Sequence, residues 1–148
     1  MTTTLARPLR LLAEDADDLA VVSAAVQDAV ARVGDLSFER KARRFTLALN
    51  RYRWEAGTQS KERVRAALQF AGVLDAKTRD LPAGHGGAVL SVLSVTFTPS
   101  GAPEDPSGAI AIAFAGGGDL RLEVECIDAV LADVSEPWAA VRAPRHRV

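Results

Sequence analysis

The sequence predicts a single α+β domain that is mainly antiparallel β-sheet. Two pseudo-repeated three-stranded units are expected to form a barrel or a sandwich, with one N-terminal helix packed against it. The first observation is residues 108–134, where apolar and polar side chains alternate around a glycine-rich break at residues 116–118. Alternation with period two around such a break is typical of a half-buried β-hairpin. The second observation is that residues 36–81 show the same kind of pattern.

The two stretches also resemble each other. Residues 74–81 (LDAKTRDL) align with residues 127–134 (IDAVLADV), and residues 68–70 align with residues 122–124 with one extra residue near Gly72. An extra residue beside a glycine indicates a β-bulge. We interpret the chain as one domain of two βββ halves, although alternating strands can also match by chance. The first half is residues 8–81, the second is residues 88–142, and residues 1–7 and 143–148 are expected to be frayed.

The bulk composition agrees with one globular domain. The chain has 148 residues, of which 48% are hydrophobic and 25% charged, as in ordinary soluble domains. The single cysteine, Cys126, excludes an internal disulfide and fits a reducing cytoplasm. No apolar run approaches the roughly 20 residues of a membrane helix, and the first residues lack the apolar core of a secretory signal. We therefore expect a cytoplasmic protein that does not bind a membrane.

The N-terminal part is expected to hold a short strand at residues 9–12 and then the helix. Asp15 is a candidate N-cap, and Asp17 and Asp18 lie in the first turn, where free N–H groups and the helix dipole favour carboxylates. Apolar residues follow at helical spacing and predict an amphipathic helix over residues 16–29. These residues are Leu19, Val22, Val26 and Ala29.

The middle of the chain predicts a run of strands. Residues 36–38 and 45–49 flank a polar turn and are expected to form a hairpin. Tyr52 and Trp54 fall on the opposite side from the apolar residues before them, which indicates a bulge at Asn50 or a strand that crosses between sheets. Residues 64–70 predict a strand with one buried side.

The remaining elements follow residues 82–87, which separate the halves. Residues 89–97 predict a strand, and residues 98–108 predict a long, mobile polar loop before the hairpin. Near the C-terminus, Ser135 with the following Glu-Pro predicts a short helical turn that places Trp138 and Val141 against the core.

Charge is distributed unevenly between the halves. Basic side chains predominate over residues 32–65, and acidic side chains predominate over residues 101–136. Opposite charges on neighbouring strands stabilise their register by a few tenths of a kcal/mol per pair, as a rough figure. They could also steer two copies of the chain together.

Two glycine-rich segments are candidates for chemistry. Residues 84–87 (GHGG) are similar to the oxyanion-hole loop of some esterases, but the G-x-S-x-G elbow that those enzymes need is missing. Residues 116–118 could hold a phosphate, but they lead into a strand and not into a helix. A linker and a hairpin turn are the preferred interpretations.

No catalytic, metal or cofactor site is expected from the titratable residues. Cys126, His85 and His146 do not have the spacing of metal ligands or of a nucleophile with its base. Glu123 and Glu125 could share a cation, but solvated strand carboxylates are far commoner. No acid, base and nucleophile can be combined, so we expect a protein that is not an enzyme.

The strongest functional signal is an alternation of arginines and aromatics within the basic segment. Such side chains on a β-surface can stack nucleic-acid bases and contact phosphates. The alternative is that the aromatics are buried while the arginines cover the solvent face with their stems. The isoelectric point near 6.1 argues against a dedicated nucleic-acid binder. The candidate binding residues are Arg51, Tyr52, Arg53, Trp54, Arg63 and Arg65.

We therefore expect a protein-interaction module whose partner is another protein or a second copy of the chain. The alternatives are a nucleic-acid-binding domain that uses the same face, and a β domain with a small ligand between its halves. Charge reversal of both Arg51 and Arg53 is expected to abolish partner binding and to leave the fold intact.

Three stretches carry a family resemblance: residues 7–30, the NRYRWE run at residues 50–55, and residues 114–129 (FAGGGDLRLEVECIDA). They resemble a family of small uncharacterised alphaproteobacterial proteins, a domain of unknown function. The resemblance covers nearly the whole chain and implies a bacterial, cytoplasmic origin. It implies no activity, substrate or catalytic residue.

Overall fold

A computed structural model describes residues 7–57, 61–82 and 87–139. Within these residues no helix is long and apolar enough to cross a membrane. The elements are β1 (Arg10–Ala13), α1 (Ala16–Ala25), β2 (Val30–Arg32), η1 (Val33–Asp35), β3 (Leu36–Glu39), β4 (Arg44–Tyr52), η2 (Trp54–Ala56), β5 (Glu62–Phe70), β6 (Val73–Arg79), β7 (Val89–Pro99), β8 (Gly108–Phe114), β9 (Asp119–Val124), β10 (Ala129–Asp133) and β11 (Trp138–Ala139).

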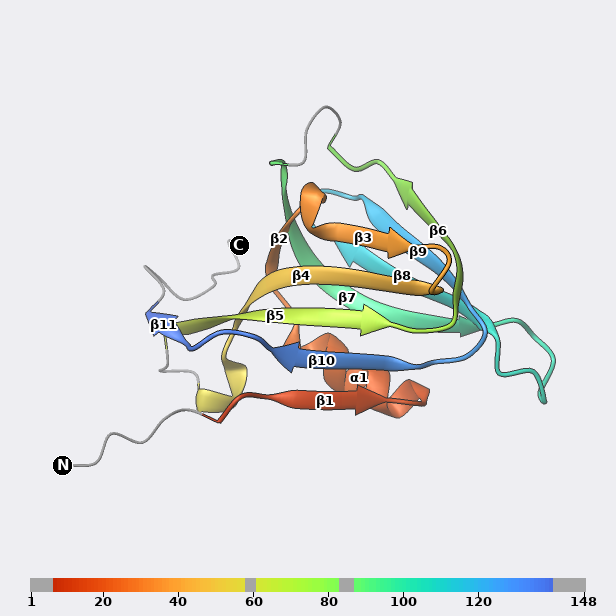
Figure 1. Ribbon diagram of the computed structural model, residues 1–148, viewed down its shortest axis with the longest axis horizontal. Coiled ribbons are helices and arrows are strands. Elements are labelled where there is room, and N and C mark those ends of the chain that lie inside the picture. Colours follow the sequence, from red (N-terminus) through yellow and green to blue (C-terminus); the bar gives the residue numbers. More distant parts are fainter. Residues whose placement is uncertain (1–6, 58–60, 83–86, 140–148) are drawn as a thin grey trace.

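The strands form two antiparallel layers (Figure 1). The front sheet has the order β1-β10-β5-β4, with β3 beside β4 and β11 beside β5; the back sheet has the order β7-β8-β9-β6. β2 joins the layers, because Val30 is opposite Asn50 of β4 on one side and Ser91 of β7 on the other. The described strands do not close into a barrel: β1 and β6 are the two ends of the path. The predicted α+β fold is confirmed in its sandwich-like form.

The two halves of the chain exchange their last strands. β4 and β5 form one hairpin and β8 and β9 form the other, but β6 pairs with β9, and β10 pairs with β5. The two crossovers touch, because the Ala71 N–H donates to Asp128 O and the Glu125 N–H donates to Gly72 O. Next to Gly72, the register shifts between Val73 and Asp75, which confirms the predicted bulge.

The core lies between the inner faces of the two sheets. Alternate residues of β4, β5, β8 and β9 are buried there, as period-two patterning predicts. The helix α1 lies behind the front sheet (Figure 1) and buries Leu19 and Val22 in the same core. Asp15 caps it as predicted, since its side chain accepts a hydrogen bond from the Asp18 N–H. The fold therefore leaves the outer face of the front sheet without a covering helix in the described chain.

The helix is shorter than predicted. It ends at Ala25, and Val26 is its C-cap. Asp28 then adopts a positive φ of 62° and its N–H donates to Val92 O, while Ala29 O accepts from the Val92 N–H. Backbone pairing with β7 therefore replaces the last helical turn. Val26 and Ala29 are still buried, so the apolar pattern identified the buried side but not the end of the helix.

Neither explanation offered for Tyr52 and Trp54, a bulge at Asn50 or a strand that crosses between sheets, describes β4, which stays beside β5 to Tyr52. β4 pairs with β5 without a register shift from Phe45 to Tyr52. The apolar alternation breaks because the next inner position is occupied by Arg51, which is fully buried. Strand geometry is regular here, and only the chemistry of the inner position changes.

The predicted helical turn near the C-terminus is also wrong. Trp138 lies in β11, opposite Arg63 of β5, and is 40% exposed. The Ser135 hydroxyl accepts a hydrogen bond from the Arg65 N–H, so this segment follows the edge of β5 and does not start a helix. Val141 lies outside the described residues.

Candidate functional site

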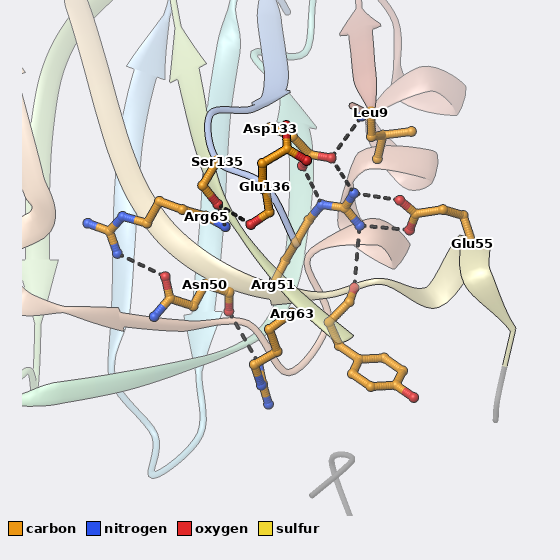
Figure 2. A network of polar contacts seen from close by, with 10 residues as sticks. Leu9, Asn50, Arg51, Glu55, Arg63, Arg65, Asp133, Ser135 and Glu136 are labelled. Atoms are coloured by element: carbon orange, nitrogen blue, oxygen red, sulfur yellow. Dashed lines mark hydrogen bonds and ion pairs between the residues drawn. The ribbon is translucent and has the colours of Figure 1, made fainter. Parts of the chain in front are cut away.

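Arg51 is the centre of a buried ion-pair network at one end of the front sheet (Figure 2). Its Nε and Nη2 donate to the two carboxylate oxygens of Asp133, each at 2.9 Å. Nη1 and Nη2 donate to the carboxylate of Glu55 at 2.8 and 2.6 Å, and Nη1 also donates to Tyr52 O at 3.3 Å. All five guanidinium N–H groups can thus be satisfied, which is the condition for a buried cation to be tolerated.

Asp133 extends this network to β1. Its Oδ2 accepts the Leu9 N–H at 2.7 Å, and its own N–H donates to Leu9 O. The side chain of Asp133 is 2% exposed, whereas that of Glu55 is 36% exposed. We call the four residues Leu9, Arg51, Glu55 and Asp133 the arginine clasp. It joins β1, β4, β10 and η2 and is a structural feature, because its guanidinium does not reach the surface.

The pKa directions agree with this geometry. Burial alone would lower the pKa of Arg51, but hydrogen bonds and charge from Glu55 and Asp133 outweigh it, so the pKa of Arg51 is raised. The hydrogen bond from Arg51 is the largest cause that lowers the pKa of Glu55, and partial burial opposes it. Both groups are therefore held in their charged forms.

The other candidate residues before β5 are also engaged internally. Tyr52 is 1% exposed, its ring contacts the Trp54 ring edge-on at 4.5 Å, and its hydroxyl is buried with no hydrogen-bond partner among the described residues. The Trp54 indole N–H donates to Gln27 O. Arg53 forms an ion pair with Glu62 at 2.6 Å. The structure thus turns Arg51 and Tyr52 away from any partner and leaves Trp54 half-buried.

Arg63 and Arg65 lie on the outer face of the front sheet. Arg65 donates to Asn50 Oδ1 and to Asp35 Oδ1, at 3.2 and 3.1 Å. Arg63 donates to Asn50 O at 3.3 Å and forms no ion pair with a described residue. Partial burial lowers the pKa of Arg63, and the charges of Asp28 and Tyr52 oppose this change. Arg63 is therefore a partly desolvated cation with no carboxylate in contact within the described chain.

The outer face of the front sheet has small and apolar residues at its centre. Register places the side chains in rows across β4, β5, β10 and β1. One row is Thr46, Gln69, Val130 and Leu12, and the next is Ala48, Ala67, Ala132 and Arg10. A third row joins Tyr52, Arg63 and Trp138. Leu12, Val134 and Trp138 are exposed on or beside these rows, at 60%, 63% and 40%.

The outer face of the back sheet has a different character. Alanines occupy β8, and charged residues occupy β9 and β6. These charges neutralise one another in three ion pairs, Lys77–Asp75, Arg79–Asp119 and Arg121–Glu123. This face has no net charge.

The opposite charges of the two halves meet inside the molecule. Three ion pairs join a basic residue of the first half to an acid of the second: Arg43–Glu125, Arg51–Asp133 and Arg79–Asp119. Only Arg79–Asp119 joins paired strands, β6 and β9, and Arg79 lies outside the basic segment of residues 32–65. Arg51 and Asp133 lie on β4 and β10, which β5 separates, and Arg43 and Glu125 lie outside the strands. Some of the basic residues of the first half are therefore neutralised by acidic residues of the second half of the same chain.

The remaining candidates are a metal cluster, the glycine turn, the cysteine, the histidines and a cleft. No group of three or more His, Cys, Asp or Glu side chains there could hold a metal ion. Residues 116–118 form the turn between β8 and β9, and Cys126 is a free thiol. His85 and His146 lie outside the described residues. A polar cleft of about 270 Å³ opens at β2, where Arg32, Asp35, Asn50 and Arg65 line it.

Comparison with known proteins places the chain in a family. Residues 9–146 match the family described as a protein of unknown function (DUF2948). The chain belongs to this family. Curated proteins and solved structures gave no significant match.

For this DUF2948 chain, sequence reasoning missed the role of Arg51 and Asp133. A signal was present: Arg51 continues the odd-numbered positions of Phe45, Leu47 and Leu49, so strict alternation places it on the inner face. Its partner Asp133 is 82 residues away in the chain, and no local pattern links the two. The row of alanines on the outer face was missed because alanine occurs on both buried and exposed faces, and its pattern along one strand does not predict a binding surface.

Proposed function

We propose that the protein is a non-enzymatic interaction module of the bacterial cytoplasm. It binds an acidic, partly apolar segment of another protein on the outer face of the front sheet. The observation that carries this proposal is the pairing of an uncovered face of small and apolar residues with arginines that have no carboxylate partner in the described chain. These arginines are Arg10 and Arg63.

Charge and anchor residues both favour this occupant. Arginine and tryptophan are enriched among the residues that dominate binding energy at protein interfaces. Trp138 is 40% exposed and lies opposite Arg63, so an apolar anchor and an unpaired cation are neighbours. The charge of Asp28 acts on Arg63, but no described carboxylate forms an ion pair with it, so the carboxylates of an acidic segment would supply the direct contact.

A nucleic acid fits this face less well. Single-stranded binders need exposed aromatic rings on which bases stack. Tyr52 is 1% exposed and the Trp54 ring packs against it. The aromatics of residues 52–54 are thus not available as the stacking platforms that the nucleic-acid alternative requires.

The test compares one substitution at two matched positions. Ala67 and Ala111 are half-buried alanines on the outer faces of central strands, one in the front sheet and one in the back sheet. Ala67→Glu places a carboxylate in the centre of the proposed face, and Ala111→Glu does the same on the control face. Random peptides displayed on phage are selected on the wild-type protein, and affinities are then measured by fluorescence anisotropy with labelled peptides and with single-stranded DNA.

We expect the selected peptides to be enriched in Asp and Glu. Ala67→Glu should weaken their binding by at least about tenfold, corresponding to about 1.4 kcal/mol, and Ala111→Glu should leave it unchanged. Circular dichroism checks that both variants fold. Selection of no peptides, selection without acidic enrichment, equal effects of the two variants, or tighter binding of DNA would each overturn the proposal.

A further inference from the structure

The outer edge of β1 has unpaired backbone groups. β1 is the last strand of the front sheet (Figure 1), and no described strand pairs with its outer edge. Leu9 O accepts the Asp133 N–H, and antiparallel pairs alternate between hydrogen-bonded and non-hydrogen-bonded. Leu11 and Ala13 therefore bond to β10, and the N–H and C=O groups of Arg10 and Leu12 point toward the open edge.

The side chains along this edge do not protect it. Exposed edge strands are usually protected by charged residues, and β6, at the other end of the path, carries Asp75, Lys77 and Arg79 on its outer side. β1 instead presents Leu12, which is 60% exposed. Arg10 precedes Leu12 by two residues and Glu14 follows it by two, just beyond β1, and neither forms an ion pair with a described residue. The Glu14 N–H donates to Asp18 Oδ2 at 3.0 Å, so Glu14 offers a second strand its C=O and its carboxylate but not its N–H.

We infer that β1 pairs antiparallel with β1 of a second copy of this chain, across a twofold axis at Leu12. In this register Leu12 is opposite Leu12 of the second copy. Arg10 is opposite Glu14 of the second copy, and the symmetry repeats that contact. One chain cannot make this pair along an extended strand, because four residues span roughly 13 Å.

Backbone and side chains select the same register. Residues with open N–H and C=O groups must face one another, so the even-numbered residues of the two strands must be opposite each other. A shift by two residues satisfies that condition but places Arg10 opposite Leu12 and Glu14 opposite Pro8. Only the register centred on Leu12 also pairs both charges.

The arginine clasp prepares the edge for pairing. Leu9 is held by two hydrogen bonds with Asp133, which in turn is held by Arg51. β1 is therefore ordered before a second copy arrives, which lowers the entropic cost of pairing. The contact is small, because β1 has four residues, so we expect a weak, salt-sensitive dimer at the low end of interface sizes.

This dimer would join two front sheets into one continuous sheet. Their outer faces would lie side by side and give a partner with two acidic segments two neighbouring binding faces. The pairing itself does not depend on the proposed function, because the backbone groups of the strand edge make it; Arg10 belongs to both the edge and the proposed face.

The test is sedimentation equilibrium of the full chain from micromolar to millimolar concentration. The wild type should pass from the 15.7 kDa monomer to a species of twice that mass. Leu12→Pro should abolish the dimer, because the Leu12 N–H takes no part in pairing with β10 and proline is tolerated at such edge positions. Arg10→Glu should weaken the dimer by about tenfold through like-charge contact, and Arg10→Glu combined with Glu14→Arg should restore it.

A chain that stays monomeric over this range would overturn the inference. Dimerisation of Leu12→Pro with unchanged affinity, or no recovery in the charge-swapped variant, would do the same. If Leu12→Pro fails to fold, the two charge variants decide the question alone. Peptide binding by Leu12→Pro, which keeps both Arg10 and Arg63, separates this outcome from failure of the proposed function.

Discussion

The two sheets of the sandwich treat their outer faces differently. On the back sheet, three ion pairs neutralise all the charges of β6 and β9. On the front sheet, Arg10 and Arg63 form no ion pair with a described carboxylate, and they flank rows of small and apolar residues. A face that neutralises itself is suited to water, whereas a face with unpaired arginines around an apolar centre is suited to a partner.

The inner faces differ as well, and the cause is the length of one hairpin. β8 ends at Phe114, and the chain turns at once through glycines, including Gly116 with a φ of 95°. The corresponding strand β4 continues to Tyr52. That extension places Arg51 at an inner position and makes the arginine clasp possible. The first half thus has a buried ion-pair network where the second half has a tight turn.

The largest expected effect is that of Arg51→Leu. The variant leaves the Asp133 carboxylate, which is 2% exposed, without its cation. Breaking a buried ion pair in this way costs about 3–5 kcal/mol, so the free energy of unfolding measured in urea should fall by that amount. Arg121→Leu on the back sheet, where the arginine side chain is 61% exposed, should change it by about 0.5 kcal/mol or less.

A second variant identifies the cause. Arg51→Leu combined with Asp133→Asn removes both buried charges and should recover part of the loss. A loss below about 1 kcal/mol for Arg51→Leu alone would show that the clasp is not a buried ion pair. The charge reversal of Arg51 and Arg53, expected from the sequence to leave the fold intact, should instead unfold it, because a carboxylate at position 51 would face Asp133 and Glu55.

A smaller effect, of opposite sign, is expected for Tyr52→Phe. The Tyr52 hydroxyl is buried and has no hydrogen-bond partner in the described part of the chain, and an unsatisfied buried polar group destabilises a fold by about 1–3 kcal/mol. Removing the hydroxyl while keeping the ring contact with Trp54 should raise the free energy of unfolding by about 1 kcal/mol. A measured loss of stability would show that the hydroxyl has a partner in solution.

Acid should weaken the clasp through Glu55. Its folded pKa is lowered, first by the hydrogen bond from Arg51, so the unfolded chain binds the proton more readily. The stabilisation is present above the unfolded pKa of about 4.3 and is lost as the pH falls through the folded pKa. Because the Glu55 side chain is 36% exposed, we expect the free energy of unfolding to lose no more than about 1 kcal/mol of stabilisation from Glu55 in acid.

The measurement is the free energy of unfolding of wild type and Glu55→Gln as a function of pH. The wild type should be more stable at neutral pH, and the difference should vanish in acid. Glu123→Gln is the control on the back sheet, because Glu123 is paired with an exposed arginine. A difference that grows as the pH falls would contradict the assigned direction.

Local patterns predicted most of the elements and few of their pairings. Asp15 marked the start of α1, and alternation in β4, β5, β8 and β9 identified the buried faces, because both signals depend on near neighbours. The exchange of β6 and β10 between the halves depends on contacts that are distant in sequence. Trp138 shows how tertiary pairing overrides a local signal, since the Ser-Glu-Pro before it resembled a helix start but β5 accepts the segment as a strand.

The smallest expected effect is on the back sheet itself. Arg79 and Asp119 form an ion pair, but the Arg79 side chain is 73% exposed, and water and salt screen such pairs. A double-mutant cycle with Arg79→Gln and Asp119→Asn should give a coupling energy of about 0.2–1 kcal/mol that decreases in high salt. The same substitution at Arg63, on the front sheet, should weaken binding of acidic peptides, whereas Arg79→Gln should not. If both variants weaken that binding equally, the contrast between the two faces has no functional meaning.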